Sequence, residues 1–315
     1  MESTESMPWA CHAHDNENFL GGVKALIHHT ETSDVHAPAV HRHMSGEHRL
    51  LDFKLREVWE YRDLILLFAR REFVVTYKQT ILGPLWIFIS PMLTSFMYAF
   101  VFGKVAGINT DGTPTLLFYL FSNAVWSLFA NCVNSCAETF TQNAHIMSKV
   151  YFPRLVMPVS NLLSAYIHFA LHALPAFCFY FYYLYTGTVH AVPARLFLLL
   201  LSLLQMGMIG FGTGIIVAAL TTKYRDLRIL IRFGITLWMY ATPVVYPLST
   251  LKGRALKLIS MNPVTSPMEL FRYSLWGKSV LSAEMLLVSW LLTLILLFSG
   301  VMLFNHVERV FADTV

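Results

Sequence analysis

The stretch MLLVSWLLTLILLFSGVMLFNHV, residues Met285–Val307, contains no Asp, Glu, Lys or Arg. A helix rises about 1.5 Å per residue, so a helix of this length reaches across a hydrocarbon core roughly 30 Å thick. Uncharged apolar stretches of this length are typical of membrane proteins. The stretch therefore predicts a transmembrane helix.

Five more charge-free stretches precede it. They are Ile81–Gly103, Pro114–Ala137, Leu155–Ala194, Leu196–Thr222 and Phe233–Leu251, and the third is long enough for one span and an external turn. Of the 315 residues, 56% are hydrophobic and 13% charged, whereas soluble domains carry about 25% charged residues. The sequence thus predicts an all-α integral membrane protein with six transmembrane helices.

The distribution of basic residues predicts the orientation. With the N-terminus inside, fourteen Lys and Arg residues flank the spans on the cytoplasmic side and seven lie in the outer loops. Basic residues concentrate on the cytoplasmic side of membrane proteins. We therefore expect a multi-pass protein with both termini in the cytoplasm.

The chain divides into three parts. Residues 1–50 form a polar, His-rich tail, which we expect to be a disordered cytoplasmic extension. Residues 51–80 have a basic, amphipathic pattern that suits an interface helix lying among the lipid headgroups. Residues 81–315 form the six-span transmembrane domain.

The loop Lys252–Ala283, before the last span, is broken by prolines and moderately apolar. Its pattern fits either a plain external loop or a pair of short outer helices that re-enter the membrane. Non-helical backbone at membrane depth is tolerated only against protein or a wet cavity. We predict the re-entrant form, which would indicate a pathway nearby.

Several catalytic and nucleotide-binding motifs are absent from the sequence. It has no G-x-x-x-x-G-K-[ST] phosphate loop, no H-E-x-x-H and no G-x-S-x-G. The spans hold no charged residue, whereas ion-coupled carriers usually keep such groups in the membrane. We predict a permease powered from outside rather than an enzyme. We expect no catalytic, cofactor-binding or metal-binding residue in this chain and no nucleic-acid partner.

Three pairs of residues within the spans have the spacing of one helix face. Cys132 and Cys136 are interpreted as packing residues, because free cysteine behaves as a small buried hydrophobe. His168 and His172 could contact a polar substrate, but interhelical hydrogen bonds are the favoured interpretation. The Gly210–Gly214 pattern permits close helix contact, either within the subunit or between two copies.

Two short cytoplasmic loops could dock into a partner, or could simply anchor the chain at the headgroups. The first loop contributes His145, Ser148, Lys149, Phe152, Pro153 and Arg154, and the second contributes Lys223, Tyr224, Arg225, Asp226, Leu227 and Arg228. Basic residues at the cytoplasmic entrance could contact a diphosphate or anionic lipid, or could anchor there as usual. These residues are Arg70, Arg71 and Lys78.

Aromatic residues crowd several spans beyond what an interfacial belt requires. Aromatic faces can stack on sugar rings without fixing them, so the set could line a path for a polysaccharide. Ordinary packing and an interfacial belt are the alternatives. The candidate path residues are Trp86, Phe88, Tyr98, Phe177, Tyr180, Tyr183, Trp238 and Tyr240.

Five segments together resemble the ABC-2 type permeases of bacterial exporters for cell-surface polysaccharides. They are VWEYRDLILLFARREFVVTYKQTILGPLWIFISP at Val58–Pro91, FPR at Phe152–Arg154, KYRDLR at Lys223–Arg228, TPVVYP at Thr242–Pro247, and NP followed by FRYSLWG within Asn262–Gly277. The resemblance covers about Leu51 to Val315. The polar tail is longer than the usual start of that family.

The resemblance implies a homodimer in the bacterial inner membrane, bound to two separate ATPase subunits that hold ATP and Mg. Both short loops would be coupling helices, and Leu55–Arg71 would be the interface helix. The substrate would be a lipid-linked O-antigen, capsule or teichoic acid chain, on undecaprenyl diphosphate. The alternatives are an ABC-2 permease for a small amphiphile such as a drug, lipid or haem-like compound, and an intramembrane transferase.

Overall fold

The structure is a computed structural model of the chain. It describes residues 55–77, 83–143, 146, 149, 152–189, 195–224 and 226–312, and the regular secondary structure in these ranges is entirely helical. The predicted tail, residues 1–50, lies outside the described residues.

Five helical segments of the described chain are long and apolar enough to cross a membrane. The first joins α4 to a π-helical turn, η2, and follows a short 3-10 turn, η1; the other four are single helices. Their bounds are Gly83–Leu85 for η1, Trp86–Tyr98 for α4, Ala99–Val105 for η2, Thr115–Gln142 for α5, Val156–Tyr185 for α7, Leu196–Lys223 for α8 and Ala283–Ala312 for α12.

The prediction of one helix over Phe233–Leu251 is wrong. The helix found there, α9, covers Leu227–Tyr240 and is followed by turns and a 3-10 segment, η4, at Leu248–Thr250. Pro243 explains the end of α9, since proline offers no N–H for the helix and disfavours helical backbone in the residue before it. With 14 residues, α9 is about 21 Å long, which is shorter than the hydrocarbon core.

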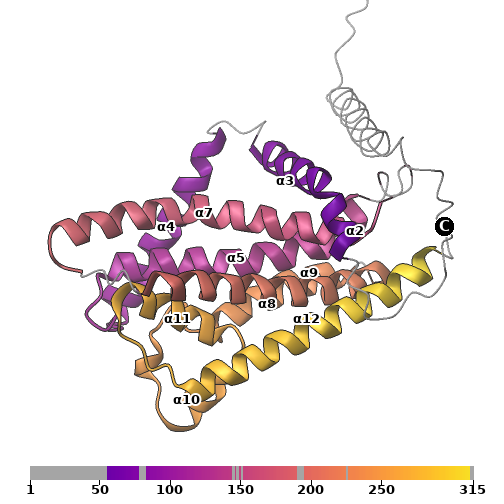
Figure 1. The fold of residues 1–315 in the computed structure, drawn as a ribbon. Coiled ribbons are helices and arrows are strands. Elements are labelled where there is room, and N and C mark those ends of the chain that lie inside the picture. The colour runs from indigo at the N-terminus through magenta and orange to yellow at the C-terminus, as the bar shows by residue number, and fades with distance from the viewer. Residues whose placement is uncertain are drawn as a thin grey trace, which may run out of the picture.

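Helix α5 is the centre of the bundle. It packs against α7 on one side and α8 on another, and α12 packs against α8. Figure 1 shows these four long helices running alongside one another. The window of α5 that could span a membrane is 72% buried, so most of this helix faces protein rather than lipid.

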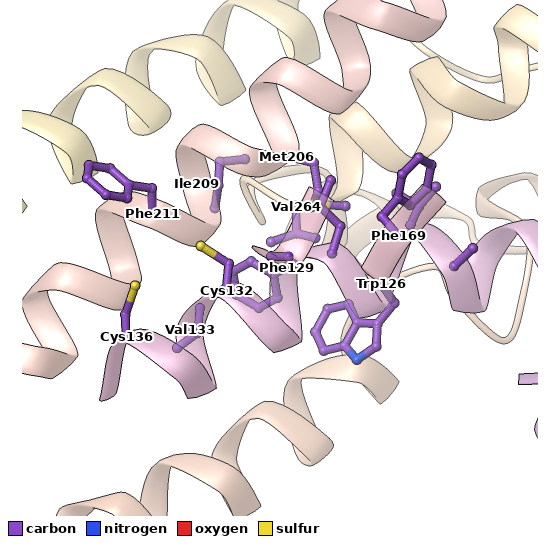
Figure 2. Packing of buried hydrophobic residues seen from close by; sticks show 14 of the residues in the cluster. Trp126, Phe129, Cys132, Val133, Cys136, Phe169, Met206, Ile209, Phe211 and Val264 are labelled. Carbon is purple, nitrogen blue, oxygen red and sulfur yellow. The ribbon is translucent and has the colours of Figure 1, made fainter. Parts of the chain in front are cut away.

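The Cys and Gly pairs of the sequence meet between α5 and α8. A Cβ atom added to Gly210 would lie 3.1 Å from Cβ of Cys132, and one added to Gly214 would lie 2.8 Å from Cβ of Cys136. Figure 2 shows both cysteines on the side of α5 that faces α8. The cysteines are therefore packing residues, as predicted, and the two glycines serve close helix contact within one subunit.

The predicted interface helix is two helices, α2 (Leu55–Glu60) and α3 (Arg62–Tyr77), separated at Tyr61. Helix α3 packs against α7, and Phe68 contacts Phe152 with ring centroids 5.9 Å apart. The apolar residues of this segment divide into two groups, because Val58 and Ile65 are buried whereas Trp59 and Leu66 are exposed. Part of the apolar surface of this segment therefore packs against the protein, and part of it is exposed.

The loop before the last span contains two short helices, α10 (Gly253–Ser260) and α11 (Thr265–Trp276). None of the residues of α10 is buried, whereas ten of the twelve residues of α11 are buried. Helix α11 packs against α8, α12 and α5. The loop is therefore not a plain external one, because its second helix is part of the bundle.

Candidate functional site

The segments predicted to dock a partner emerge from one end of the bundle. At that end α5 and α8 finish side by side, since the Thr221 hydroxyl donates a 2.9 Å hydrogen bond to the carbonyl oxygen of Ala137. The chain after α5 leads to the start of α7, and the chain after α8 leads to the start of α9. The two short loops therefore share this end.

The structure describes nine of the twelve predicted docking residues at least in part. One of them, Phe152, is buried. The half-buried residues are Pro153, Arg154, Leu227 and Arg228, and the exposed residues are Lys149, Tyr224 and Asp226. Lys223 is the last residue of α8. His145, Ser148 and Arg225 lie outside the described residues. The exposed members present polar groups at the end of the bundle, and Phe152 anchors its loop on α3.

A polar pocket of about 330 Å³ opens at the same end, between α3, α5, α7 and α9. It mixes charged, amide and hydroxyl groups with three apolar side chains. The lining consists of Phe68, Arg71, Glu72, Val75, Asn134, Ser135, Glu138, Asn143, Met157, Ser160, Asn161 and Arg232. Such a set offers both donors and acceptors of hydrogen bonds to a polar ligand.

Several side chains of the pocket are held by hydrogen bonds between different helices. Asn161 on α7 donates to the Ser135 carbonyl oxygen at 3.0 Å and to the Thr139 hydroxyl at 2.8 Å, both on α5. The Ser135 hydroxyl donates to Glu72 on α3 at 3.1 Å. Glu138 on α5 forms an ion pair with Arg232 on α9. The pocket is thus a junction of four helices.

Of the predicted entrance residues that the structure describes, Arg70 and Arg71, one lines the pocket and the other does not. Arg71 lines the pocket and donates a 3.4 Å hydrogen bond to the side-chain oxygen of Asn143, and burial lowers the pKa of its guanidinium from the ordinary value. Arg70, the next residue along α3, is exposed. Lys78 lies outside the described residues. Arg71 alone of the described pair contributes to the pocket.

Four of the eight predicted aromatic path residues belong to packed clusters within the chain. Phe177 and Tyr180 lie around Phe121, with ring centroids 5.1 Å and 6.2 Å from it. Trp238 packs on Phe129 at 5.1 Å, and the hydroxyl of Tyr98 donates to the sulfur of Met239 at 3.6 Å. These four residues contribute to the packing of one subunit.

The other four residues of that set are more open. Trp86 and Tyr240 are exposed, and Phe88 and Tyr183 are half-buried. The single chain therefore does not bring the eight aromatic residues together in one line. His168 of α7, for which interhelical hydrogen bonds are the favoured interpretation of the sequence, lies beside Phe73 of α3 with ring centroids 6.2 Å apart.

Sequence reasoning missed a buried ion pair at the opposite end of α5. Arg272 donates to Glu269 at 2.8 Å within α11, and the two side chains are 4% and 6% exposed. The segment MELFR places an acid and a base three residues apart in an apolar stretch. That spacing was the available signal, because charges at i and i+3 share one helix face.

Comparison with known proteins identifies the family. The sequence profile described as "ABC-2 type transporter" matches residues 63–276, which include α3, α4, α5, α7, α8, α9 and α11. The chain belongs to the ABC-2 type transporter family. The resemblance noted from the five sequence segments is thereby confirmed, and this ABC-2 protein is a multi-pass membrane protein.

The ABC-2 protein is similar to permeases of surface-polysaccharide export. It is 27% identical to the O-antigen export system permease protein RfbA of Myxococcus xanthus over 83% of this chain and 98% of that protein. It is 29% identical to an O-antigen export system permease protein RfbA of Klebsiella pneumoniae over 80% of this chain and 94% of that protein. It is 22% identical to the capsule polysaccharide export inner-membrane protein CtrC of Neisseria meningitidis over 73% of this chain and 85% of that protein.

Proposed function

We propose that this chain is the transmembrane permease subunit of an ATP-driven exporter that moves a lipid-linked polysaccharide from the cytoplasm across the bacterial inner membrane. The observation that carries the proposal is the alignment of nearly the whole length of the O-antigen permeases with this chain. The glycan is an O-antigen or capsule chain on undecaprenyl diphosphate. A small-amphiphile permease has no comparable support, and an intramembrane transferase has none.

The topology proposed is six crossings with both termini in the cytoplasm. Five of these crossings are the long helical segments. The remaining crossing, which is the fifth in chain order, is supplied by α9 together with the turns that follow it. Arg232 near the start of α9 pairs with Glu138, and the carbonyl oxygen of Val245 accepts a 3.2 Å hydrogen bond from Tyr119. Glu138 and Tyr119 are about 28 Å apart along α5 at the helical rise, which is close to the thickness of a hydrocarbon core.

The energy for transport comes from a separate ATPase subunit, present in two copies, which binds ATP and Mg. The chain lacks a phosphate loop, and both candidate coupling loops leave the bundle at one end. The exposed side chains of Tyr224 and Asp226 are suited to dock there. Two copies of the chain form the permease, and the re-entrant pair α10 and α11 lies at the outer face.

The polar pocket is proposed to receive the headgroup of the lipid-linked substrate. Arg71 supplies a guanidinium, which binds phosphate oxygens well. The amides and hydroxyls around it suit the hydroxyl groups of a sugar. The exposed rings of Trp86 and Tyr240 are available to line a path between two copies of the chain.

Co-purification tests the proposal. The tagged chain is purified in mild detergent from cells that also express the ATPase subunit encoded beside it, and surface glycan is measured in the same strain with and without the chain. We expect the ATPase subunit to co-purify and surface glycan to disappear when the chain is deleted. A purified chain with no ATPase partner, or a deletion strain with normal surface glycan, would contradict the proposal.

A further inference from the structure

The guanidinium of Arg272 connects α11 to parts of the chain that are distant in sequence. It donates to Glu269 on α11 at 2.8 Å, to the hydroxyl of Ser122 on α5 at 2.7 Å, and to the carbonyl oxygen of Val244, after α9, at 3.4 Å. It also lies over the ring of Phe118, 4.1 Å from the centroid. One side chain thus ties α11 both to α5 and to the turn that follows α9.

Glu269 extends these contacts to the segment before α12. Its second carboxylate oxygen accepts a 3.2 Å hydrogen bond from Ser279. The N-terminal end of α11 is fixed separately, because Ser289 on α12 donates to the carbonyl oxygen of Pro263 at 2.8 Å. Helix α11 is therefore held at both ends, and the ion pair provides the hold at its C-terminal half.

The surroundings of the ion pair exclude water. Phe121, next to Ser122 on α5, contacts Phe271 and Trp276 of α11 with ring centroids 5.6 Å and 6.0 Å apart. Nε of Arg272 has no hydrogen-bond partner within the described residues. The guanidinium is thus desolvated and incompletely satisfied in the position that the structure shows.

A buried ion pair of this kind has an uneven effect on two states of a protein. In the dry state its attraction is largely offset by desolvation, so an apolar pair of similar volume would be as stable or more stable. In a state where α11 has moved and water has entered, both charges recover their hydration, which an apolar pair cannot do. The charged pair therefore lowers the cost of the hydrated state.

We propose that Glu269 and Arg272 are positioning residues that seat α11 across the end of the bundle opposite the polar pocket and allow it to unseat into water during transport. In the seated state this end is closed. Loss of one partner leaves a single buried charge and favours the unseated state. Replacement of both partners by apolar residues favours the seated state. The proposal rests on the proposed function only where export is measured.

The seating of α11 can be measured without any glycan. Ser274, in the C-terminal half of α11, is 7% exposed, so Ser274→Cys in the full-length chain reports unseating through its reaction with a water-soluble maleimide in membrane vesicles, read by mass spectrometry at that site. Adding Arg272→Gln or Glu269→Gln should raise the labelling rate at least about tenfold, since breaking a buried pair is strongly unfavourable. Ser122→Ala, which removes one anchor, provides a milder variant if these fail to fold.

The double variant Glu269→Leu/Arg272→Met separates positioning from simple stability. It should label no faster than the parent at position 274, yet lower surface glycan at least about tenfold, because the hydrated state has become unfavourable. The exposed pair Arg56–Glu60, changed to Gln at both positions, is the matched control and should alter neither readout.

Two results would overturn the proposal. One is unchanged labelling in Arg272→Gln, Glu269→Gln and Ser122→Ala. The other is normal export by a double variant that remains tightly seated, which would reduce the pair to a packing element. Failure of the proposed function alone would look different, because the labelling rates would change as expected while surface glycan would not depend on the chain.

Discussion

Helix α5 carries two polar clusters that contrast in almost every physical respect. At Ser135 and Glu138 it borders a pocket of about 330 Å³, where Arg232 of the Glu138 ion pair has 62% of its side chain exposed. At Ser122 it meets Arg272, whose side chain is 4% exposed. Both clusters contain an Arg–Glu pair. Their different burial predicts different energies for the same change.

The two clusters are kept apart by an apolar layer. Ser122 and Ser135 are about 20 Å apart along α5, and the residues between them include Leu128, Phe129 and Cys132, all fully buried. Figure 2 shows this layer, in which α5 side chains meet Ile209 and Met206 of α8. One end of the helix is therefore open to polar ligands while the other is sealed, and the predictions below test each part of that contrast.

The largest expected effect comes from removing one charge at each cluster. Arg272→Leu should lower the free energy of unfolding by about 3–5 kcal/mol, because it leaves the Glu269 carboxylate buried without its partner. Arg232→Leu should lower it by less than about 1 kcal/mol, since that pair is partly solvated. Thermal unfolding of the purified chain in detergent, followed by tryptophan fluorescence, measures both.

Equal losses for the two variants would contradict the contrast in burial. The volume change is the same in both substitutions, so the comparison isolates the environment of the charge. A loss at Arg232 as large as that at Arg272 would mean that the pocket is closed to water in the native protein.

The second effect concerns the layer between the clusters. Gly214→Val should cost about 1–3 kcal/mol of stability, because an added Cβ would lie 2.8 Å from Cβ of Cys136. Gly234→Ala on α9 is the matched control: a Cβ there meets nothing within 4 Å, and alanine should stabilise the helix by about 0.5–1 kcal/mol. The same unfolding measurement applies, and a neutral Gly214→Val would refute the close contact of α5 with α8.

Much of this arrangement could be predicted from the sequence, because hydropathy is a local property. The charge-free stretches locate α5, α8 and α12 within five residues at each end, and the third stretch, Leu155–Ala194, contains α7. The end of α9 was also predictable, since Pro243 lies inside the stretch that was read as a single span. A lack of charge permits a stretch to enter the membrane but does not keep its backbone helical, and proline can end a helix whatever the hydropathy of its neighbours.

The polar clusters could not be predicted in the same way, because their contacts join residues distant in sequence. Arg272 lies in the predicted outer loop Lys252–Ala283, and nothing in the local pattern places it beside Ser122 or Val244. The aromatic residues show the same limit. Phe177 and Tyr180 are three residues apart, so the sequence indicates that they share one face of a helix. The ring that both contact, Phe121, belongs to another helix.

A third prediction tests the pocket through its guanidinium. Arg71→Gln should lower the rate of glycan export about tenfold, which corresponds to the loss of one charge-assisted hydrogen bond to the substrate. Arg70→Gln is the control one residue away, since Arg70 is exposed and does not line the pocket. Export is followed as surface glycan appearing after a pulse of labelled sugar, at matched membrane levels of each variant. Similar export by both variants would remove the pocket from the substrate's route.

The smallest expected effect lies in the apolar part of the bundle, where a polar side chain joins α8 to α12. Gln205 is fully buried and its amide donates to Ser289 at 2.8 Å and to Thr293 at 3.4 Å. Its own oxygen has no partner within the described residues, so the group is only half-satisfied. Gln205→Leu should therefore cost about 0.6 kcal/mol, the usual worth of a hydrogen bond between membrane helices.

The change at Gln205 leaves Ser289 with its hydrogen bond to Pro263, so α11 should stay seated and export should be unchanged. Thr94→Ala is the control, because within the part of the chain that the structure describes the Thr94 hydroxyl donates to a carbonyl oxygen of its own helix, that of Ser90. A loss at Gln205 that approached the loss at Arg272 would mean that the apolar layer depends on polar contacts as strongly as the sealed end does. The contrast along α5 would then be one of solvent access alone, and not of how each level is held together.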